Sequence, residues 1–336
     1  MADLRRRVAR LVRGPAVRAA ACWLLLALIC AWLTPGFLDF ELRGEQWHGT
    51  LLDIAHRATP TLLVALGMTL VIGTGGVDLS VGAVMAIAAT TTGLAVRDHG
   101  AGPAECVLLA LAVGGLAGAF NGALVAWLHL QPIVATLILF TAGRGIAQMA
   151  SSGTIVTFQS NGVAALASGA WLSLPITIWI SCGALALLFV VVRRSAFGLY
   201  LQALGDNPRA AAVAGLPVGA LILATYALCS GLSALAGVLA AAEIRAGDPS
   251  STGLFIELDA ILAVVIGGTE LRGGRTRLVG TVFGVLILQT LTTTVLMHGA
   301  RLDLALIVKA LAVLAVVAAQ SPRLGEWSRV RREAKA

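Results

Sequence analysis

Long apolar runs alternate with short polar segments along nearly the whole chain. Most runs are about 15 to 25 residues long, and about 20 apolar residues are enough for a helix to span a bilayer. A window of about 19 residues predicts roughly ten spans, at residues 17–34, 59–73, 81–96, 106–128, 132–150, 172–192, 218–242, 258–268, 278–297 and 304–319. The pattern predicts an all-α polytopic membrane protein with a single transmembrane domain over residues 1–336.

Composition agrees with this pattern. Hydrophobic residues make up 58% of the chain and charged residues 12%, and the mean hydropathy is +0.90. A chain of this composition cannot be a water-soluble globule. The five cysteines lie inside apolar runs and form no CxxC pair, so the sequence indicates neither a metal site nor a disulfide framework.

The basic residues fall mainly on one side of the predicted membrane. With a cytoplasmic N-terminus and ten crossings, 17 of the 24 Lys and Arg residues lie on the inside, counting Arg18 at the inner edge of the first span, and 5 lie in outside segments. Cytoplasmic loops are enriched in Lys and Arg, so this split predicts that both termini are cytoplasmic. The inside segments include a basic tail at 1–16, a loop at 193–217, a loop at 269–277 with three arginines, and a basic tail at 320–336. The net charge of +7 therefore reflects topology and does not indicate a nucleic-acid partner.

Two predicted spans are too short to cross the membrane as straight helices. Residues 59–73 would be about 22 Å long and 258–268 about 17 Å, against a hydrocarbon core of ~30 Å. Glycines follow each of them, as GTGG and GGT. Helices broken at membrane depth are tolerated where the open backbone faces protein or a cavity, and in transporters they mark binding sites.

The first break continues into GGVDLSVG, where Gly75, Gly76, Asp78 and Ser80 precede the next apolar run. Asp78 or Ser80 is expected to accept hydrogen bonds from the first amides of the following helix. An intramembrane acid also suggests a transport route or its gate, because burial of a carboxylate in lipid is costly. The two interpretations are compatible.

Five further polar residues lie in or beside apolar runs. Arg144 lies within 132–150, with Gln148 one turn later on the same face; a contact with substrate hydroxyls and a structural pair with another helix both remain open. Glu257 and Asp259 lie at the outer edge of 258–268, where they can cap a helix or contact a substrate or a delivering partner. Lys309 is expected to reach the outer surface or to pair with Asp303. The candidate translocation pathway or gate comprises Gly75, Gly76, Asp78, Ser80, Arg144, Gln148, Glu257 and Asp259.

Enzyme motifs are absent from the sequence. A Walker A loop requires GK[ST], but both lysines are followed by alanine, and no HExxH occurs. The chain is therefore not expected to be an enzyme, and the energy for transport must come from elsewhere.

The polar segment 193–219 predicts a short helix at the cytoplasmic surface. Asp206 or Asn207 can cap it, Pro208 suits its first position and Gly215 can end it. Such a helix suits the docking of a partner, although an ordinary connecting loop would have the same signals.

Five segments together resemble a known family: GGVDLSVGAVMAIAA, QPIVATLILFTAGRGIAQ, LGDNPRAAAVAGL, ELDAILAVVIGGTELRGGRTRLVGTVFGVLI and VKALAVLAVV. They are similar to the permease subunits of ribose-type bacterial ABC sugar importers, and most similar to the galactofuranose-type permeases. Similarity extends over nearly the whole chain beyond residue 50. Gly75, Gly76, Asp78, Leu79, Ser80 and Gly82 match the signature of this family, and its coupling loop is matched by Gly205, Asn207, Ala210, Ala211 and Gly215, with Asp206 and Arg209 in the same segment.

The resemblance implies a type II ABC importer permease in the bacterial inner membrane. Its implied partners are a second permease copy or a related permease, membrane lipid, a periplasmic sugar-binding protein, and ATPase subunits that carry the ATP and Mg²⁺; no cofactor is expected in this chain. The expected function is import of a monosaccharide, such as galactofuranose or ribose, by alternating access. An ion-gradient-driven transporter and an ABC permease for a nucleoside or autoinducer remain alternatives.

Overall fold

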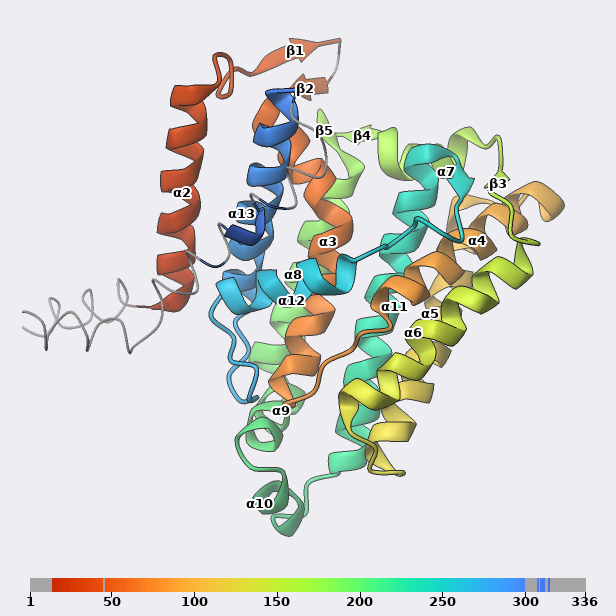
Figure 1. Ribbon diagram of the computed structural model, residues 1–336, viewed down its shortest axis with the longest axis vertical. Helices are drawn as coiled ribbons and strands as arrows, with labels where there is room; N and C mark the ends of the chain where they lie inside the picture. Colours follow the sequence, from red (N-terminus) through yellow and green to blue (C-terminus); the bar gives the residue numbers. More distant parts are fainter. Residues whose placement is uncertain (1–13, 45, 300–306, 308, 312–313, 315–336) are drawn as a thin grey trace, which may run out of the picture.

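The computed structural model describes residues 14–44 and 46–299, and beyond them residues 307, 309–311 and 314 (Figure 1). Most of the described chain is helical. The helices are α2 (Pro15–Leu33), α3 (Thr50–Gly73), α4 (Val81–His99), α5 (Pro103–Ala126), α6 (Pro132–Ala150), α7 (Asn161–Ser168), α8 (Ile176–Arg194), α9 (Ala196–Asp206), α10 (Pro208–Val213), α11 (Val218–Ile244), α12 (Ile256–Ile266) and α13 (Leu278–Met297).

The prediction of a helical membrane protein with about ten spans is confirmed. In the described part of the chain, seven helices are long and apolar enough to cross a membrane: α2, α3, α5, α6, α8, α11 and α13. The shorter or more polar helices α4 and α12 correspond to two further predicted spans. Most of the tenth predicted span, 304–319, lies outside the described residues, as do nearly all of the tail 1–16 and the whole of the tail 320–336.

One of the two short spans is longer than predicted. Helix α3 starts at Thr50, nine residues before the predicted start, and its 24 residues extend roughly 36 Å. The polar side chains of Asp53, His56 and Arg57 interrupt the apolar pattern without ending the helix, because they line a cavity rather than face lipid. Pro60 lies inside the helix. By contrast, α12 has only 11 residues, as the sequence indicated.

Three short antiparallel strand pairs lie at the upper end of the molecule in Figure 1. They are β1 (Glu41–Arg43) with β2 (Gln46–His48), β3 (Val156–Thr157) with β6 (Ala246–Gly247), and β4 (Ala170–Trp171) with β5 (Leu174–Pro175). Helices α9 and α10 lie at the opposite, lower end. The strand pairs were not predicted, since two or three residues carry no detectable period.

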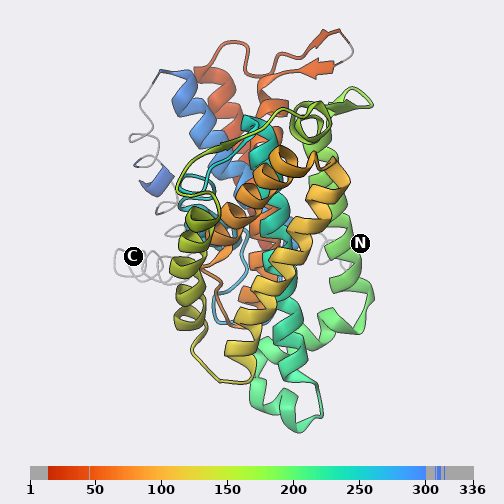
Figure 2. The same ribbon diagram turned by 90° about the vertical axis from the view of Figure 1, so that its right-hand side faces the viewer.

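Helix α3 forms the centre of the core. Every residue from Leu62 to Gly73 is buried, and α3 packs against α8, α11, α12 and α13. Helices α5 and α11 run side by side over most of their lengths (Figure 2). Their close approach depends on Gly114, Gly118 and Gly122, which share one face of α5: a Cβ atom at Gly118 would lie 2.3 Å from the carbonyl oxygen of Tyr226. Small residues that let backbones approach are typical of membrane helix interfaces.

Candidate functional site

The segment between α3 and α4 is a buried polar joint. It leaves the lower end of α3 and returns to the start of α4 in the middle of the molecule (Figure 1). Asp78 and Ser80 are completely buried. Asp78 Oδ1 accepts hydrogen bonds from the amide of Ser80 at 2.9 Å and from its hydroxyl at 2.6 Å. The shortest hydrogen bonds to the Asp78 carboxylate therefore come from Ser80, two residues along the chain.

Three neighbouring helices complete this joint. Asn121 of α5 donates from Nδ2 to Ser80 Oγ at 2.8 Å and to Asp78 Oδ1 at 3.5 Å. Ser230 of α11 donates to Asp78 Oδ2 at 3.5 Å. Thr136 of α6 accepts from the Leu79 amide at 3.2 Å. The joint thus fixes the broken backbone to three spans.

The expected helix cap is only partly present. Ser80 occupies the N-cap position of α4 but makes no side-chain capping bond, because its backbone has helical rather than extended angles (φ −78°, ψ −9°). Among the described residues, Asp78 accepts from one backbone amide, that of Ser80, which precedes the helix. Gly76 is also buried, and a Cβ atom there would lie 2.6 Å from the Tyr226 hydroxyl, whereas Gly75 is exposed with φ +83°. Asp78 itself is completely buried and bonded to α11, so it lies in a joint between helices in this structure.

Arg144 and Glu257 lie near each other at the start of α12. Arg144 Nη1 donates to the backbone carbonyls of Ser250 at 3.1 Å and Thr252 at 2.6 Å, so it fixes the loop that leads into α12. Glu257 is 5% exposed, and its Oε2 makes no hydrogen bond with the described residues. This oxygen lies against the first turn of α4, since a Cβ atom at Gly82 would be 2.7 Å from it.

Asp259 and Gln148 lie apart from this pair. Asp259 forms an ion pair with Lys309, whose Nζ is 3.0 Å from Oδ1 and 2.8 Å from Oδ2. The expected partner of Lys309 was Asp303, which lies outside the described residues, and the observed partner is on α12 instead. Gln148 is exposed on α6 and does not contribute to the contacts of Arg144. The predicted pathway residues therefore fall into separate places rather than one site.

The segment from α9 to α10 has the local structure that the sequence predicted. Asn207 is the N-cap of α10 and accepts from the Ala210 amide at 3.0 Å, with Pro208 at the first helical position. Gly215 follows the helix with φ +81°, a conformation that glycine adopts without strain. Arg209, Ala210 and Val213 are exposed, and Val213 is 91% exposed.

Ala211 differs from its expected role. Its side chain is only 4% exposed, so it packs α10 against its own chain and is not available as a contact for a partner. The exposed residues of α10 are the ones that a partner can touch.

Helix α9 rests on the lower end of α3 through backbone contact. At Gly205 a Cβ atom would lie 2.0 Å from the Gly73 carbonyl oxygen and 2.3 Å from the Gly274 nitrogen. The Gly274 amide donates to the same Gly73 carbonyl at 3.0 Å. We refer to Gly73, Gly205 and Gly274 as the glycine seat. It joins the end of α3, the end of α9 and the loop 267–277.

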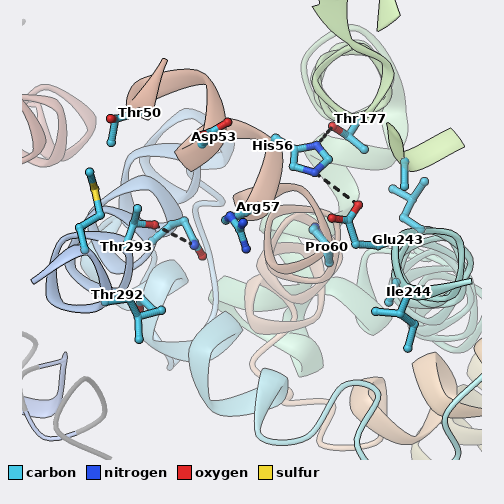
Figure 3. Close-up of a pocket in the computed structure, with 16 residues that line it drawn as sticks. Thr50, Asp53, His56, Arg57, Pro60, Thr177, Glu243, Ile244, Thr292 and Thr293 are labelled. Carbon is cyan, nitrogen blue, oxygen red and sulfur yellow. Dashed lines mark hydrogen bonds and ion pairs between the residues drawn. The ribbon is translucent and has the colours of Figure 1, made fainter. Parts of the chain in front are cut away.

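A cavity of about 730 Å³, lined by both polar and apolar side chains, lies at the upper end of the molecule, between α3, α8, α11 and α13 (Figure 3). His56 hydrogen-bonds through Nδ1 to Thr177 Oγ1 at 2.7 Å, and its Nε2 is 3.4 Å from Glu243 Oε2. On α13, Gln289 donates to Thr293 Oγ1 at 3.3 Å. These residues were not predicted from the sequence. Polar residues at helical spacing in an apolar stretch, such as Asp53, His56 and Arg57, were the available signal.

Comparison with known proteins gives a family match. Residues 50–317 match the family described as the branched-chain amino acid transport system / permease component. No solved structure matches the chain.

Similar proteins extend over most of the chain. It is 46% identical over 300 residues to the galactofuranose transporter permease protein YtfT of Escherichia coli (strain K12), covering 89% of this chain and 88% of that protein. The chain is 34% identical to the ribose import permease protein RbsC of Bacillus subtilis (strain 168), over 87% of this chain and 88% of that protein. It is 33% identical to the fructose import permease protein FruF of Bifidobacterium longum (strain NCC 2705), over 96% of this chain and 92% of that protein.

Proposed function

Because the chain belongs to the family of branched-chain amino acid transport system permease components, we propose that it is the permease subunit of an ABC importer for a monosaccharide. The single observation that carries the choice of a sugar is the 46% identity to a galactofuranose permease over nearly the whole length of both proteins. Import permeases for ribose and fructose among its relatives support the same class of solute. The chain is a transport component and not an enzyme.

Three partners follow from this proposal. An ATPase, with its ATP and Mg²⁺, binds at the end of the molecule that carries α9 and α10. A solute-binding protein delivers sugar at the opposite end, and a second copy or a related permease completes the channel. The exposed face of α10, with Arg209, Ala210 and Val213, is the proposed ATPase contact. Asn207 and Gly215 define the ends of that helix.

The buried joint and the loop into α12 have proposed roles in gating. Asp78 and Ser80 hold the return segment to α5 and α11, so a change in the spacing of these helices must also move the start of α4. Arg144 and Glu257 similarly connect α6, α4 and α12. These residues would transmit movement of the spans rather than read the sugar.

Uptake by the purified assembly tests the proposed function. Proteoliposomes that contain the permease, its ATPase and the sugar-loaded binding protein should accumulate D-galactose, D-ribose or D-fructose only when ATP is supplied on the ATPase side. The chain itself has no Walker A loop, so omission of the ATPase should abolish accumulation. Uptake driven by an ion gradient without ATP would contradict the proposal, and a non-hydrolysable ATP analogue is the matched control.

The proposed orientation places α9 and α10 in the cytoplasm of a bacterium. Arginines gather at that end, at Arg193, Arg194, Arg209, Arg272, Arg275 and Arg277. In intact cells a membrane-impermeant maleimide should therefore label Ser152→Cys, at the upper end, and should leave Ala212→Cys of α10 unlabelled. Both positions are exposed. Permeabilised cells should label both variants, and the reverse pattern in intact cells would overturn the orientation.

A further inference from the structure

The cavity at the upper end is built from one face of each of three helices. On α3, Asp53, His56, Arg57 and Pro60 are spaced i, i+3, i+4 and i+7, which places them on one face. On α13, Gln289, Thr292, Thr293 and Leu296 have the same spacing, and α11 contributes Glu243. Helices α3 and α13 thus turn polar residues toward a common space, and α11 adds one carboxylate to it (Figure 3).

Most polar groups in this cavity are already positioned by one another, but Arg57 is not. His56, Thr177 and Glu243 form one bonded group, and Gln289 with Thr293 forms another. The Arg57 guanidinium lies between these groups and makes no hydrogen bond or ion pair with the residues that the structure describes (Figure 3). A guanidinium presents five donors, so it is ready to bind oxygen atoms of a solute.

The cavity adjoins a second cavity and ends at Pro60 along α3. A second cavity of about 320 Å³, toward the β1–β2 hairpin, shares Thr50 and Asp53 with it. Toward the lower end of the molecule, the part of α3 beyond Pro60 is packed into the core, where Leu62 to Gly73 are all buried. Pro60 has no amide hydrogen, so the His56 carbonyl lacks its α-helical donor and is a further acceptor beside the cavity. The two cavities therefore adjoin at the upper end, and the part of α3 below Pro60 belongs to the core rather than to the cavity lining.

The lining specifies the chemistry of a ligand. Asp53 and Glu243 supply carboxylates, Arg57 supplies a cation, and threonine hydroxyls and the Gln289 amide supply neutral donors and acceptors. Two carboxylates against one guanidinium oppose an anionic solute. The sixteen lining residues include no Phe, Tyr or Trp, so the cavity would recognise hydroxyl groups rather than stack on a ring. A volume of about 730 Å³ is in the usual range for a small-molecule site.

We infer that this cavity is the site where the permease receives a neutral polyhydroxylated solute, with Arg57, Glu243 and Gln289 binding its hydroxyl groups. The inference rests on the proposed function for the direction of transport and for the sugar as the natural member of this class. Charged side chains form stronger hydrogen bonds than neutral ones. Arg57 is therefore expected to contribute most, because its donors are not used within the protein.

A protection experiment locates the ligand without relying on transport activity. In the complete transporter, a membrane-impermeant maleimide added from the upper side should modify Thr293→Cys. The sugar that wild type takes up, among D-galactose, D-ribose and D-fructose, should slow this modification, whereas D-galacturonate should not. Thr292→Cys is the second variant if the first does not fold. Labelling is compared with the unmodified chain, because Cys22 and Cys182 are exposed.

A transport experiment tests the role of Arg57. With saturated binding protein, Arg57→Ala should lower the sugar uptake rate about tenfold, as expected for the loss of a charged hydrogen bond, and Arg57→Lys should retain more. The ratio of sugar moved to ATP hydrolysed should fall with it, while ATPase copurification stays normal. The control is Arg97→Ala, since Arg97 is exposed and its one ion pair among the described residues is with the adjacent Asp98.

The outcomes separate this inference from the proposed function. Wild type that takes up no sugar would count against the proposed function. If wild type takes up sugar, then an Arg57→Ala rate equal to wild type, or a Thr293→Cys that is unmodified or unprotected, would overturn the assignment of this cavity. Protection by D-galacturonate would overturn its assignment to neutral solutes.

Discussion

Replacing Asp78 with alanine should abolish transport and destabilise the protein. Alanine leaves the buried amide and hydroxyl of Ser80 without their acceptor, and it also removes the oxygens that Asn121 and Ser230 contact. An unsatisfied buried polar group costs about 1 to 3 kcal/mol, so the two Ser80 donors together cost about 2 to 6 kcal/mol. A fall of about 5 °C or more in the melting temperature of purified protein is expected.

Asp78→Asn separates hydrogen bonding from charge. Asparagine keeps an oxygen that can accept from Ser80 at the same place, so this variant should retain most of the stability and part of the uptake. Ser230→Ala is the mild control, because it removes only a donor at 3.5 Å. Melting temperature and ATP-dependent uptake are measured for all three variants. If Asn is as damaging as Ala while both insert normally, the negative charge itself is required and the hydrogen-bond account fails.

Gly205→Val should separate the ATPase from the permease. The valine Cβ atom would lie 2.0 Å from the Gly73 carbonyl oxygen, so either α9 or the end of α3 must move. Overpacking typically costs about 1 to 3 kcal/mol, and a contact with backbone atoms leaves little room for relaxation. Copurification of the ATPase and sugar uptake should both be lost. Ala196→Val on the exposed first turn of α9 is the matched control and should behave as wild type.

A second variant distinguishes the packing that positions α9 and α10 from the exposed surface of α10. Val213→Glu changes a side chain that is 91% exposed and should leave the melting temperature unchanged. If Val213 packs against the ATPase, this variant should still reduce copurification, because a buried unpaired charge at an interface costs about 2 to 5 kcal/mol. Wild-type copurification of both Gly205→Val and Val213→Glu would show that the segment is only a connector. The loop with Arg272, Arg275 and Arg277 would then be the next candidate.

Local signals explain which parts of the structure could be predicted. The apolar runs at 132–150 and 278–297 became helices with those bounds, because length and hydropathy are properties of one segment. The short helix α10 was also predictable, since Asn207, Pro208 and Gly215 act within a few residues of one another. Helix α3 was misjudged at its start because the pattern could not separate polar residues facing a cavity from residues ending a helix.

The partners of each candidate residue could not be predicted from the sequence. Asp78 meets residues 43 and 152 positions away, on α5 and α11, and no periodicity connects them. Arg144 contacts backbone carbonyls, which every residue possesses, so no side-chain pattern indicates its target. The cavity requires the faces of three helices to converge, and one sequence shows each face without their relative positions.

Helix α3 is a single rod between the upper cavity and the glycine seat. Its 24 residues give an arm of roughly 36 Å, so a rigid tilt of about 5° about one end would displace the other by about 3 Å. That displacement is comparable to the 3.0 Å separation between the Gly73 oxygen and the Gly274 nitrogen. Pro60 marks the point where the rod can bend. Between Pro60 and Gly73, α3 is enclosed by α8, α11, α12 and α13. A force that tilts α3 at the glycine seat must therefore move these helices as well.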